Sequence, residues 1–176
     1  MTPLDAMALA IKETQRDAFV AQNGYLFLLL RIDDNSEEND WSFRTTTLSV
    51  DRLKQAIALA ESSAAARDLR YYRVMAVVKS DNNPWAGRIS VGRARNNDIV
   101  LPHASVSKLH AHFSETKTGL TLSDAGSRNG THLSGVPVGA DQPVEAKPGD
   151  EIAFGLISLK LMTAADLYDF VMARIC

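Results

Sequence analysis

The sequence predicts a mainly β protein, with a β-sandwich or barrel over residues 71–162. An N-terminal extension over residues 1–70 is expected to be helix–strand–strand–helix, and residues 163–176 to close the chain with a short helix. In the first part, apolar residues recur at helical spacing on both sides of a strongly apolar run. From Tyr71 onward, short runs of β-branched and aromatic residues alternate with clusters of Gly, Asn, Asp and Pro, which is typical of all-β domains.

The first predicted helix begins at Thr2-Pro3 and ends at Asn23-Gly24. A hydroxyl followed by proline favours a helix start, and Asn-Gly favours a helix end. The next predicted strand, Tyr25–Ile32, is apolar at nearly every position, so we expect it to be covered on both faces. That cover could come from the chain's own helices or from another protein.

A second strand is expected over Trp41–Leu48, forming a hairpin with Tyr25–Ile32, and Ser49 is expected to cap a second helix. The extension shows no recognisable chemistry. From the sequence alone it is open whether residues 1–70 form a separate domain or extend the sandwich.

Short strands are expected to follow one another through residues 71–162. They cover Arg73–Lys79, Arg88–Val91, Ile99–Leu101, Lys108–Ser114, Leu120–Ser123, Thr131–Leu133, Pro143–Glu145, Glu151–Phe154 and Ser158–Met162, and the closing helix covers Ala165–Ile175. We expect no cofactor, since no Walker, dinucleotide-binding or catalytic-triad pattern occurs, and the chain is not expected to be an enzyme.

The formal net charge of −2 is too balanced for a general nucleic-acid binder. Residues 1–70 hold eight basic and eleven acidic side chains, whereas residues 71–162 hold ten and eight. Basic residues in the second part fall in loops, which suits a localised anionic ligand. One cysteine, charges within the first twenty residues and only short apolar runs argue against disulfides, a signal peptide and a membrane partner, so a cytoplasmic location is expected.

Four clusters in the β-rich part stand out, and the last two each supply short polar side chains and one cation from a loop. They are Val91-Gly92-Arg93, Asn97–Leu101, Val106–Ala111 and Asp124–Thr131. A phosphate dianion prefers charge-assisted hydrogen bonds from Arg and Lys together with hydroxyl and amide donors. Glycine lets the backbone turn tightly and approach a ligand closely.

In this order and spacing, these clusters resemble the forkhead-associated (FHA) domain family. The resemblance also includes Gly149-Asp150-Glu151-Ile152 and Phe154-Gly155, and it covers roughly residues 71–162. It implies a β-sandwich of two antiparallel sheets that recognises phosphothreonine in an extended peptide, through loops at one end. Where the family carries a second Asn-Gly, this chain has Ser134-Gly135.

The resemblance also implies roles for individual residues. Arg93 would bind the phosphate, Ser107 would donate its hydroxyl to the phosphate, and Lys108 and Arg128 would add further phosphate contacts. Asn129 would hydrogen-bond the peptide backbone. A second set, Gly92, His110 and Gly130, would shape the loops.

The expected partner is a phosphothreonine-containing protein or peptide, with a Ser/Thr kinase as a further candidate. Two alternatives stay open: a scaffolding role for the N-terminal extension, and self-binding through a phosphorylated threonine at Thr45, Thr46 or Thr47. A zinc site at His110 and His112 is disfavoured, because no third ligand stands at a suitable spacing, and no metal is expected.

Overall fold

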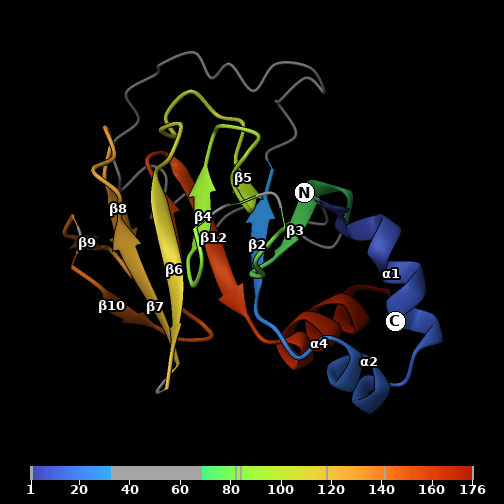
Figure 1. Cartoon of the computed structure of the whole chain (residues 1–176). Coiled ribbons are helices and arrows are strands. Elements are labelled where there is room, and N and C mark those ends of the chain that lie inside the picture. The colour runs from blue at the N-terminus through green and yellow to red at the C-terminus, as the bar shows by residue number, and fades with distance from the viewer. Residues whose placement is uncertain are drawn as a thin grey trace.

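Two β-sheets pack face to face in the computed structural model, and helices lie beside them at one side (Figure 1). The structure describes residues 2–32, 69–81, 83, 85–117, 119–140 and 142–175. The expected two-sheet sandwich is therefore confirmed.

The larger sheet has seven strands in the order β1-β3-β2-β12-β11-β8-β9, and every neighbouring pair is antiparallel. Its strands are β1 (Thr2–Pro3), β2 (Phe27–Arg31), β3 (Tyr72–Ala76), β8 (Thr131–Leu133), β9 (Val136–Val138), β11 (Glu151–Phe154) and β12 (Ile157–Met162).

The smaller sheet has five strands in the order β10-β7-β6-β4-β5. Its strands are β4 (Ile89–Gly92), β5 (Ile99–Val100), β6 (Ala111–Thr116), β7 (Gly119–Asp124) and β10 (Val144–Ala146). Only the β4–β5 pair in this sheet is parallel.

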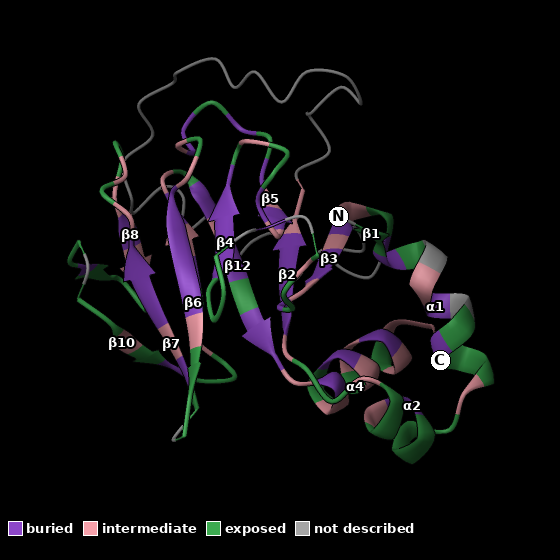
Figure 2. Ribbon diagram, in the orientation of Figure 1, coloured by how far each residue is buried: buried purple, intermediate pink, exposed green. Residues whose placement is uncertain are grey.

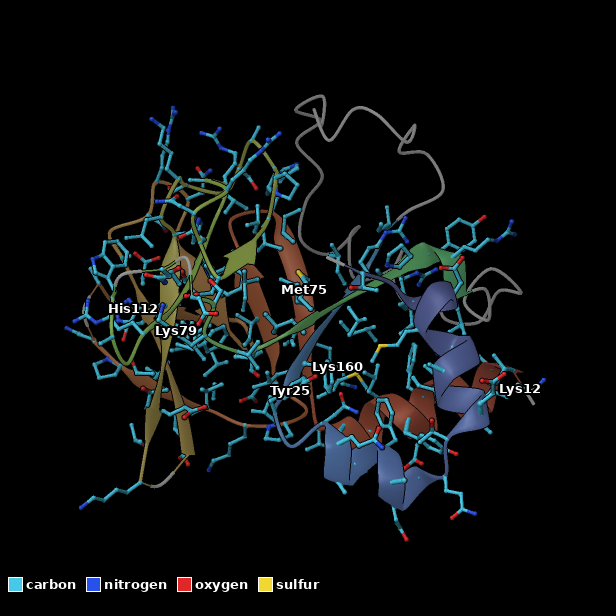
Figure 3. All side chains as sticks on the ribbon, turned by 45° about the vertical axis from the view of Figure 1, so that its right-hand side comes forward. Lys12, Tyr25, Met75, Lys79, His112 and Lys160 are labelled. Atoms are coloured by element: carbon cyan, nitrogen blue, oxygen red, sulfur yellow. The ribbon has the colours of Figure 1, made fainter. Side chains whose placement is uncertain are left out.

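The main core fills the space between the two sheets, where the strands are mostly buried (Figure 2). Alternation along each strand explains which side chains enter it, because successive residues of a strand point to opposite faces. On β6, Ala111 and Phe113 join this core, and on β3, Met75 does so (Figure 3). The intervening His112 belongs to the opposite face of β6.

A second core lies between the outer face of the seven-stranded sheet and the helices α1 (Leu4–Glu13), α2 (Arg16–Gln22) and α4 (Ala164–Ile175). On β2, Leu28 and Leu30 face the main core, while Phe27 and Leu29 face this second one. The expectation that Tyr25–Ile32 is covered on both faces is confirmed for Phe27–Leu30, although Tyr25 is exposed, and the chain's own helices supply the outer cover. No helix in the described ranges has the length and apolar character needed to cross a membrane.

Part of the N-terminal extension belongs to the sandwich itself, because β2 pairs with β12 on one edge and β3 on the other. Both edges of β2 are therefore occupied, so the predicted hairpin with Trp41–Leu48 is wrong. Its place is taken by the pairing of β2 with β3. The second strand and helix predicted for the extension lie outside the described residues, as do Thr45, Thr46 and Thr47.

The first predicted helix is also corrected: it breaks at Thr14 and Gln15, which have extended backbone angles. The break lets α2 pack on α4, where the rings of Phe19 and Tyr168 lie 5.8 Å apart. Arg16 on α2 also forms a bidentate ion pair with Asp169 at 2.8 Å. Contacts distant in sequence thus override the continuous helical pattern.

The Ser134-Gly135 pair forms the turn between β8 and β9, a strand absent from the sequence-based expectation. Ser134 and Gly135 have φ of 49° and 81°. Positive φ at both central residues is the requirement of the two-residue hairpin turn that Asn-Gly favours. Ser-Gly therefore supplies the same type of backbone here as the Asn-Gly pair it replaces.

Candidate functional site

Three loops meet at one end of the sandwich, the upper end in Figure 1. They follow β4 (residues 93–98), β5 (residues 101–110) and β7 (residues 125–130). All five residues expected to contact a phosphopeptide lie on these loops: Arg93, Ser107, Lys108, Arg128 and Asn129. Hydrogen bonds between the loops bring most of them into direct contact.

Arg93 begins the first loop and is exposed. Its backbone N–H donates to the carbonyl oxygen of Ser107 at 2.9 Å, and its Nε donates to the carbonyl oxygen of Val106 at 3.2 Å. Within the described part of the chain, the two terminal nitrogens of this guanidinium make no hydrogen bond. The side chain is thus held through its Nε–H, while its four terminal N–H donors stay available to an anion.

Ser107 links the second loop to the third. Its Oγ accepts a hydrogen bond from the backbone N–H of Arg128 at 3.0 Å. A hydroxyl group that accepts one bond can still donate its own hydrogen. The arrangement therefore leaves the Ser107 hydroxyl able to donate to an anion near Arg93.

His110 is buried and holds the second loop in place through both of its ring nitrogens. Its Nδ1 accepts from the backbone N–H of Ser107 at 3.0 Å, and its Nε2 lies 3.1 Å from the carbonyl oxygen of Gly130. These partners require the neutral tautomer that carries hydrogen on Nε2. Burial lowers the pKa of His110, although the Gly130 carbonyl and Asp124 oppose that shift, so the neutral form is favoured.

Gly92 ends β4 beneath the same loops. A Cβ added there would lie 2.3 Å from the carbonyl oxygen of Lys108 and 2.8 Å from Nδ2 of Asn97. Nδ2 of Asn97 donates to that same carbonyl at 2.7 Å. Only glycine allows the second loop to approach β4 this closely. Gly130, the other glycine of the predicted set, has φ of 77°, which favours glycine for a different reason.

The remaining predicted residues are less constrained. Nδ2 of Asn129 donates to the carbonyl oxygen of Ser105 at 2.7 Å, which leaves its carbonyl oxygen and exposed position open to a ligand. Lys108 and Arg128 are both exposed and enter the described hydrogen bonds through their backbones. The backbones of Lys108 and Arg128 are therefore fixed at the site, whereas no hydrogen bond among the described residues holds their charged side-chain groups.

Two residues that sequence reasoning did not single out connect these loops. Ser105 accepts at its Oγ from the backbone N–H of Leu156 at 3.0 Å, in the turn between β11 and β12. Asp124 accepts from the backbone N–H and hydroxyl of Ser127 and from the hydroxyl of Thr131. The Asp124–Ser127 spacing is a known local turn signal, but the contacts of Ser105 depend on the fold.

Burial would by itself raise the pKa of Asp124, yet the hydrogen bonds from Ser127 and Thr131 outweigh it and lower the pKa. The carboxylate is buried and directed at internal donors. Its negative charge is thus separated from the exposed cations of the loops. Basic and hydroxyl groups dominate the ligand-accessible end.

Asp98 supports the first loop from the opposite side. Its carboxylate accepts from the backbone N–H and hydroxyl of Ser80, from the backbone N–H of Ser90, and from Nδ2 of Asn83. Burial opposes its ionisation, but the hydrogen bonds from Ser80 and Ser90 hold the pKa of Asp98 well below its usual range. This carboxylate therefore connects the segment before β4 with the loop after it.

A metal role for the histidine pair receives no support in the described residues, where no three His, Cys, Asp or Glu side chains gather around one point. Both ring nitrogens of His110 are also engaged, by Ser107 and Gly130. His110 lies in the loop before β6 and holds that loop through these two contacts.

Two curated bacterial proteins are similar in sequence to parts of this chain. Glycogen accumulation regulator GarA of Mycobacterium tuberculosis is 38% identical over 74 residues, which cover 42% of this chain and 44% of GarA. The oxoglutarate dehydrogenase inhibitor of Corynebacterium glutamicum is 29% identical over 136 residues, or 72% of this chain and 93% of the inhibitor. The chain spans less than half of the length of GarA and of other curated relatives that it matches.

Among solved structures, Mycobacterium tuberculosis EmbR in complex with a low-affinity phosphopeptide is 31% identical. The match covers 44% of this chain and 20% of EmbR, with a TM-score of 0.40. The family model described as FHA domain matches residues 89–155, a stretch that contains the three loops and all five predicted contact residues. The resemblance to the FHA-domain family is thus confirmed over residues 89–155.

Proposed function

We propose that this chain is a phosphothreonine-dependent adaptor, which binds a phosphorylated protein through the three loops at the end of its sandwich. It works downstream of a Ser/Thr kinase in the cytoplasm, and it is a reader of phosphorylation rather than an enzyme. The observation that supports this most strongly is the backbone hydrogen bond from Arg93 to Ser107, which brings these two residues together within the segment that the FHA-domain model matches.

The phosphate is assigned to the space beside Arg93 and Ser107. A phosphothreonine carries about −1.5 to −2 charges at neutral pH and three strong acceptor oxygens. The terminal nitrogens of Arg93 supply charged donors, and the Ser107 hydroxyl supplies a neutral one. Lys108 and Arg128 add positive charge from exposed positions on both sides.

The peptide backbone is assigned to Asn129. Its Nδ2 is engaged with Ser105, so the side chain has a fixed orientation while its Oδ1 stays available as an acceptor. A peptide N–H next to the phosphothreonine is the matching donor. Because His110, Gly92 and Gly130 set the loop shapes, little of the site needs to be ordered on binding.

The scaffolding alternative loses its motivation. It depended on the apolar run Tyr25–Ile32 needing a cover, and the described helices of the same chain provide that cover. We therefore propose no assembly role for this segment.

Replacing Arg93 with alanine tests the proposal. We expect Arg93→Ala to weaken binding of phosphothreonine peptides by at least about tenfold, because hydrogen bonds to charged groups contribute about 1.5–3 kcal/mol each. The fold should be retained, since the side chain is exposed and packs little. Fluorescence anisotropy with a degenerate phosphothreonine peptide library measures the affinity, and circular dichroism checks the fold.

Lys117→Ala is the matched control, because Lys117 is an exposed cation in the turn between β6 and β7, at the other end of the sandwich (Figure 1). Unphosphorylated and phosphoserine libraries run beside the phosphothreonine library. Equal binding by the parent protein and Arg93→Ala, or equal binding of the three libraries, would reject the proposal.

A further inference from the structure

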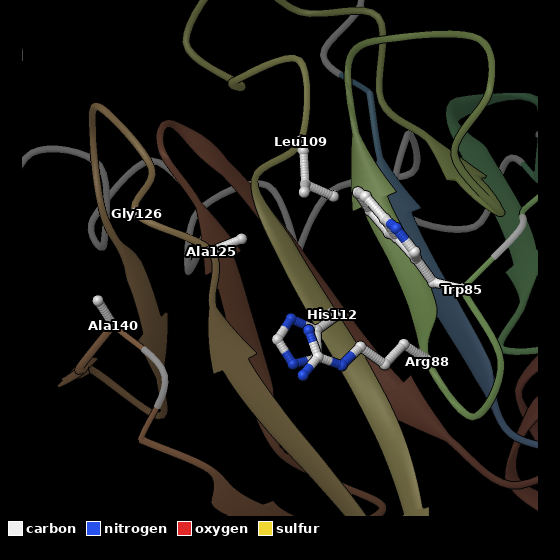
Figure 4. Close-up of a pocket in the computed structure, with 7 residues that line it drawn as sticks. All are labelled: Trp85, Arg88, Leu109, His112, Ala125, Gly126 and Ala140. Atoms are coloured by element: carbon white, nitrogen blue, oxygen red, sulfur yellow. The ribbon is translucent and has the colours of Figure 1, made fainter.

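A pocket of about 280 Å³ opens on the outer face of the five-stranded sheet (Figure 4). It lies next to the three loops of the candidate site, residues 93–98, 101–110 and 125–130, which we call the recognition loops. It is lined by Trp85, Arg88, Leu109, His112, Ala125, Gly126 and Ala140. His112 lies opposite Ser90 of β4 and Ser123 of β7, on the face of β6 that points away from the main core. The pocket is therefore separate from the space beside Arg93 and Ser107.

Some residues that line the pocket are direct neighbours, along the chain, of residues at the candidate phosphate site. Leu109 directly follows Lys108 in the second loop, and Ala125 and Gly126 lead into Ser127 and Arg128 in the third. The same two loops thus present one face to the phosphate and another to the pocket. A peptide bound at Arg93 and Ser107 would therefore lie against loops that also line the pocket.

Trp85 and Arg88 form the opposite wall, on a turn that the fold holds in place. The backbone N–H of Trp85 donates to Oδ1 of Asn83 at 3.0 Å, and the N–H of Arg88 donates to the carbonyl oxygen of Trp85 at 3.4 Å. Asn83 is itself buried and donates to Oγ of Ser90 at 2.6 Å and to Asp98. The wall is therefore anchored to β4 and the first loop.

The chemistry of the walls favours an aromatic side chain. Small-molecule pockets span about 300–1,000 Å³, so this smaller pocket fits a single side chain. Trp85 is an aromatic side chain that is 49% exposed, and Leu109, Ala125 and Ala140 add apolar surface. Arg88 adds a cation, which attracts the face of an aromatic ring but has no such attraction to an aliphatic chain.

We propose that this pocket reads an aromatic residue that flanks the phosphothreonine in the partner protein. Arg93 and Ser107 recognise the phosphate, and Trp85 and Arg88 select among phosphorylated sequences. This inference rests on the proposed function, since it deepens recognition by the same site.

A positional peptide library tests the proposal. Each phosphothreonine peptide carries a single phenylalanine, and the library places it in turn at every position up to four residues before or after the phosphothreonine. Four residues span about 13 Å along an extended chain. An otherwise identical alanine peptide is the reference. We expect phenylalanine at one position to strengthen binding about tenfold over alanine. Cyclohexylalanine at that position should be weaker, because it keeps the size but lacks the aromatic ring.

Three variants locate the effect. Trp85→Ala removes a wall, Ala125→Leu fills the pocket, and Arg88→Gln removes the charge at similar length. The readout is the ratio of affinities for the phenylalanine and alanine peptides, which should approach one in Trp85→Ala and Ala125→Leu. In Arg88→Gln, phenylalanine and cyclohexylalanine should bind alike. Val136→Ala, at a 66% exposed apolar residue of the other sheet, should keep the parent ratio.

The outcomes separate this inference from the proposed function. If phosphopeptides bind in an Arg93-dependent way without any aromatic preference, the pocket assignment is overturned and the reader function stands. A preference that persists in both Trp85→Ala and Ala125→Leu overturns it equally. If the folded protein binds no phosphopeptide, both proposals fall together.

Discussion

At the scale of single residues, the site depends on how closely its backbone segments approach. Gly92 permits the carbonyl oxygen of Lys108 to lie where any side chain would collide with it. Asn97 then satisfies that carbonyl with its amide. The exposed residues that we propose as phosphopeptide contacts are therefore positioned by a glycine that need not touch the ligand.

Gly92→Ala should both destabilise the protein and weaken phosphopeptide binding. A Cβ at 2.3 Å from a backbone carbonyl forces the second loop to move, at a cost of about 1–3 kcal/mol for overpacking. Thermal denaturation and peptide titration measure the two effects. Gly24→Ala is the control, because a Cβ at Gly24 meets no atom within 4 Å. An unchanged melting temperature in Gly92→Ala would contradict the steric reading.

At the scale of elements, the loops are connected through carboxylates and hydroxyls, in addition to the apolar packing of Leu101 and Val106 in the main core. Asp98 connects the segment before β4 with the loop after it, and Asp124 holds the loop after β7. Ser105 connects the second loop with Asn129 and with the turn before β12. Such buried carboxylates stabilise the fold as long as the surrounding N–H and O–H groups donate hydrogen bonds to them.

Asp98→Asn should cost at least about 2 kcal/mol of unfolding free energy, because buried donors of Ser80 and Ser90 lose a charged acceptor. Urea denaturation measures the loss. Asp150→Asn is the control and should cost clearly less, since Asp150 accepts from Ser134 and Lys147 in an exposed turn where water can substitute.

The pH dependence follows from the lowered pKa of Asp98. A depressed folded-state pKa stabilises the protein at every pH above the ordinary Asp value of about 3.9 and loses that contribution as the pH falls below it. The stability gap between parent and Asp98→Asn should therefore narrow below about pH 4. A gap that stays constant between neutral pH and pH 3 would contradict this account.

Sequence patterns predicted the β-strands of residues 71–162 well, because alternation and turn residues are local signals. Thr131–Leu133 and Glu151–Phe154 have their expected bounds, whereas β9 was missed because Val136–Val138 is short and contains Pro137. The break after α1 and the two-sided pairing of β2 were also missed. Both depend on partners far along the chain, namely α4, β3 and β12.

The sequence named the residues expected to contact the ligand and the loop-shaping residues Gly92, His110 and Gly130, but it did not point to the support from Ser105. Arg93, Ser107 and Asn129 stand in motifs, so a pattern could name them. Ser105 gains its importance from Leu156, which lies far along the chain in the turn after β11, and such a contact has no sequence signature. Their roles toward a ligand stay predictions until binding is measured.

At the scale of the whole molecule, stability and recognition lie in different layers. The second core, under α1, α2 and α4, covers the outer face of the seven-stranded sheet. The recognition loops and the Trp85 pocket belong to the end of the sandwich and to the five-stranded sheet. A change in one layer should have little effect on the other.

Leu167→Ala tests this separation. Leu167 is fully buried on α4 within the second core, so truncation should cost about 2–5 kcal/mol. Phosphopeptide affinity should match the parent at temperatures where the variant is folded. Differential scanning calorimetry and titration measure the two quantities, with Val136→Ala as an exposed control. A loss of affinity as large as that of Arg93→Ala would show that the layers are coupled.

The pairing of β2 with β3 has a consequence for how the chain can vary. The N–H of Ile32 donates to the carbonyl oxygen of Tyr71 at 2.7 Å, so the two ends of the intervening segment lie side by side. The entropy of closing a loop grows only with the logarithm of its length. A flexible linker inserted directly after Ile32 should therefore change the free energy of folding little, which makes this position a natural insertion point in the sandwich.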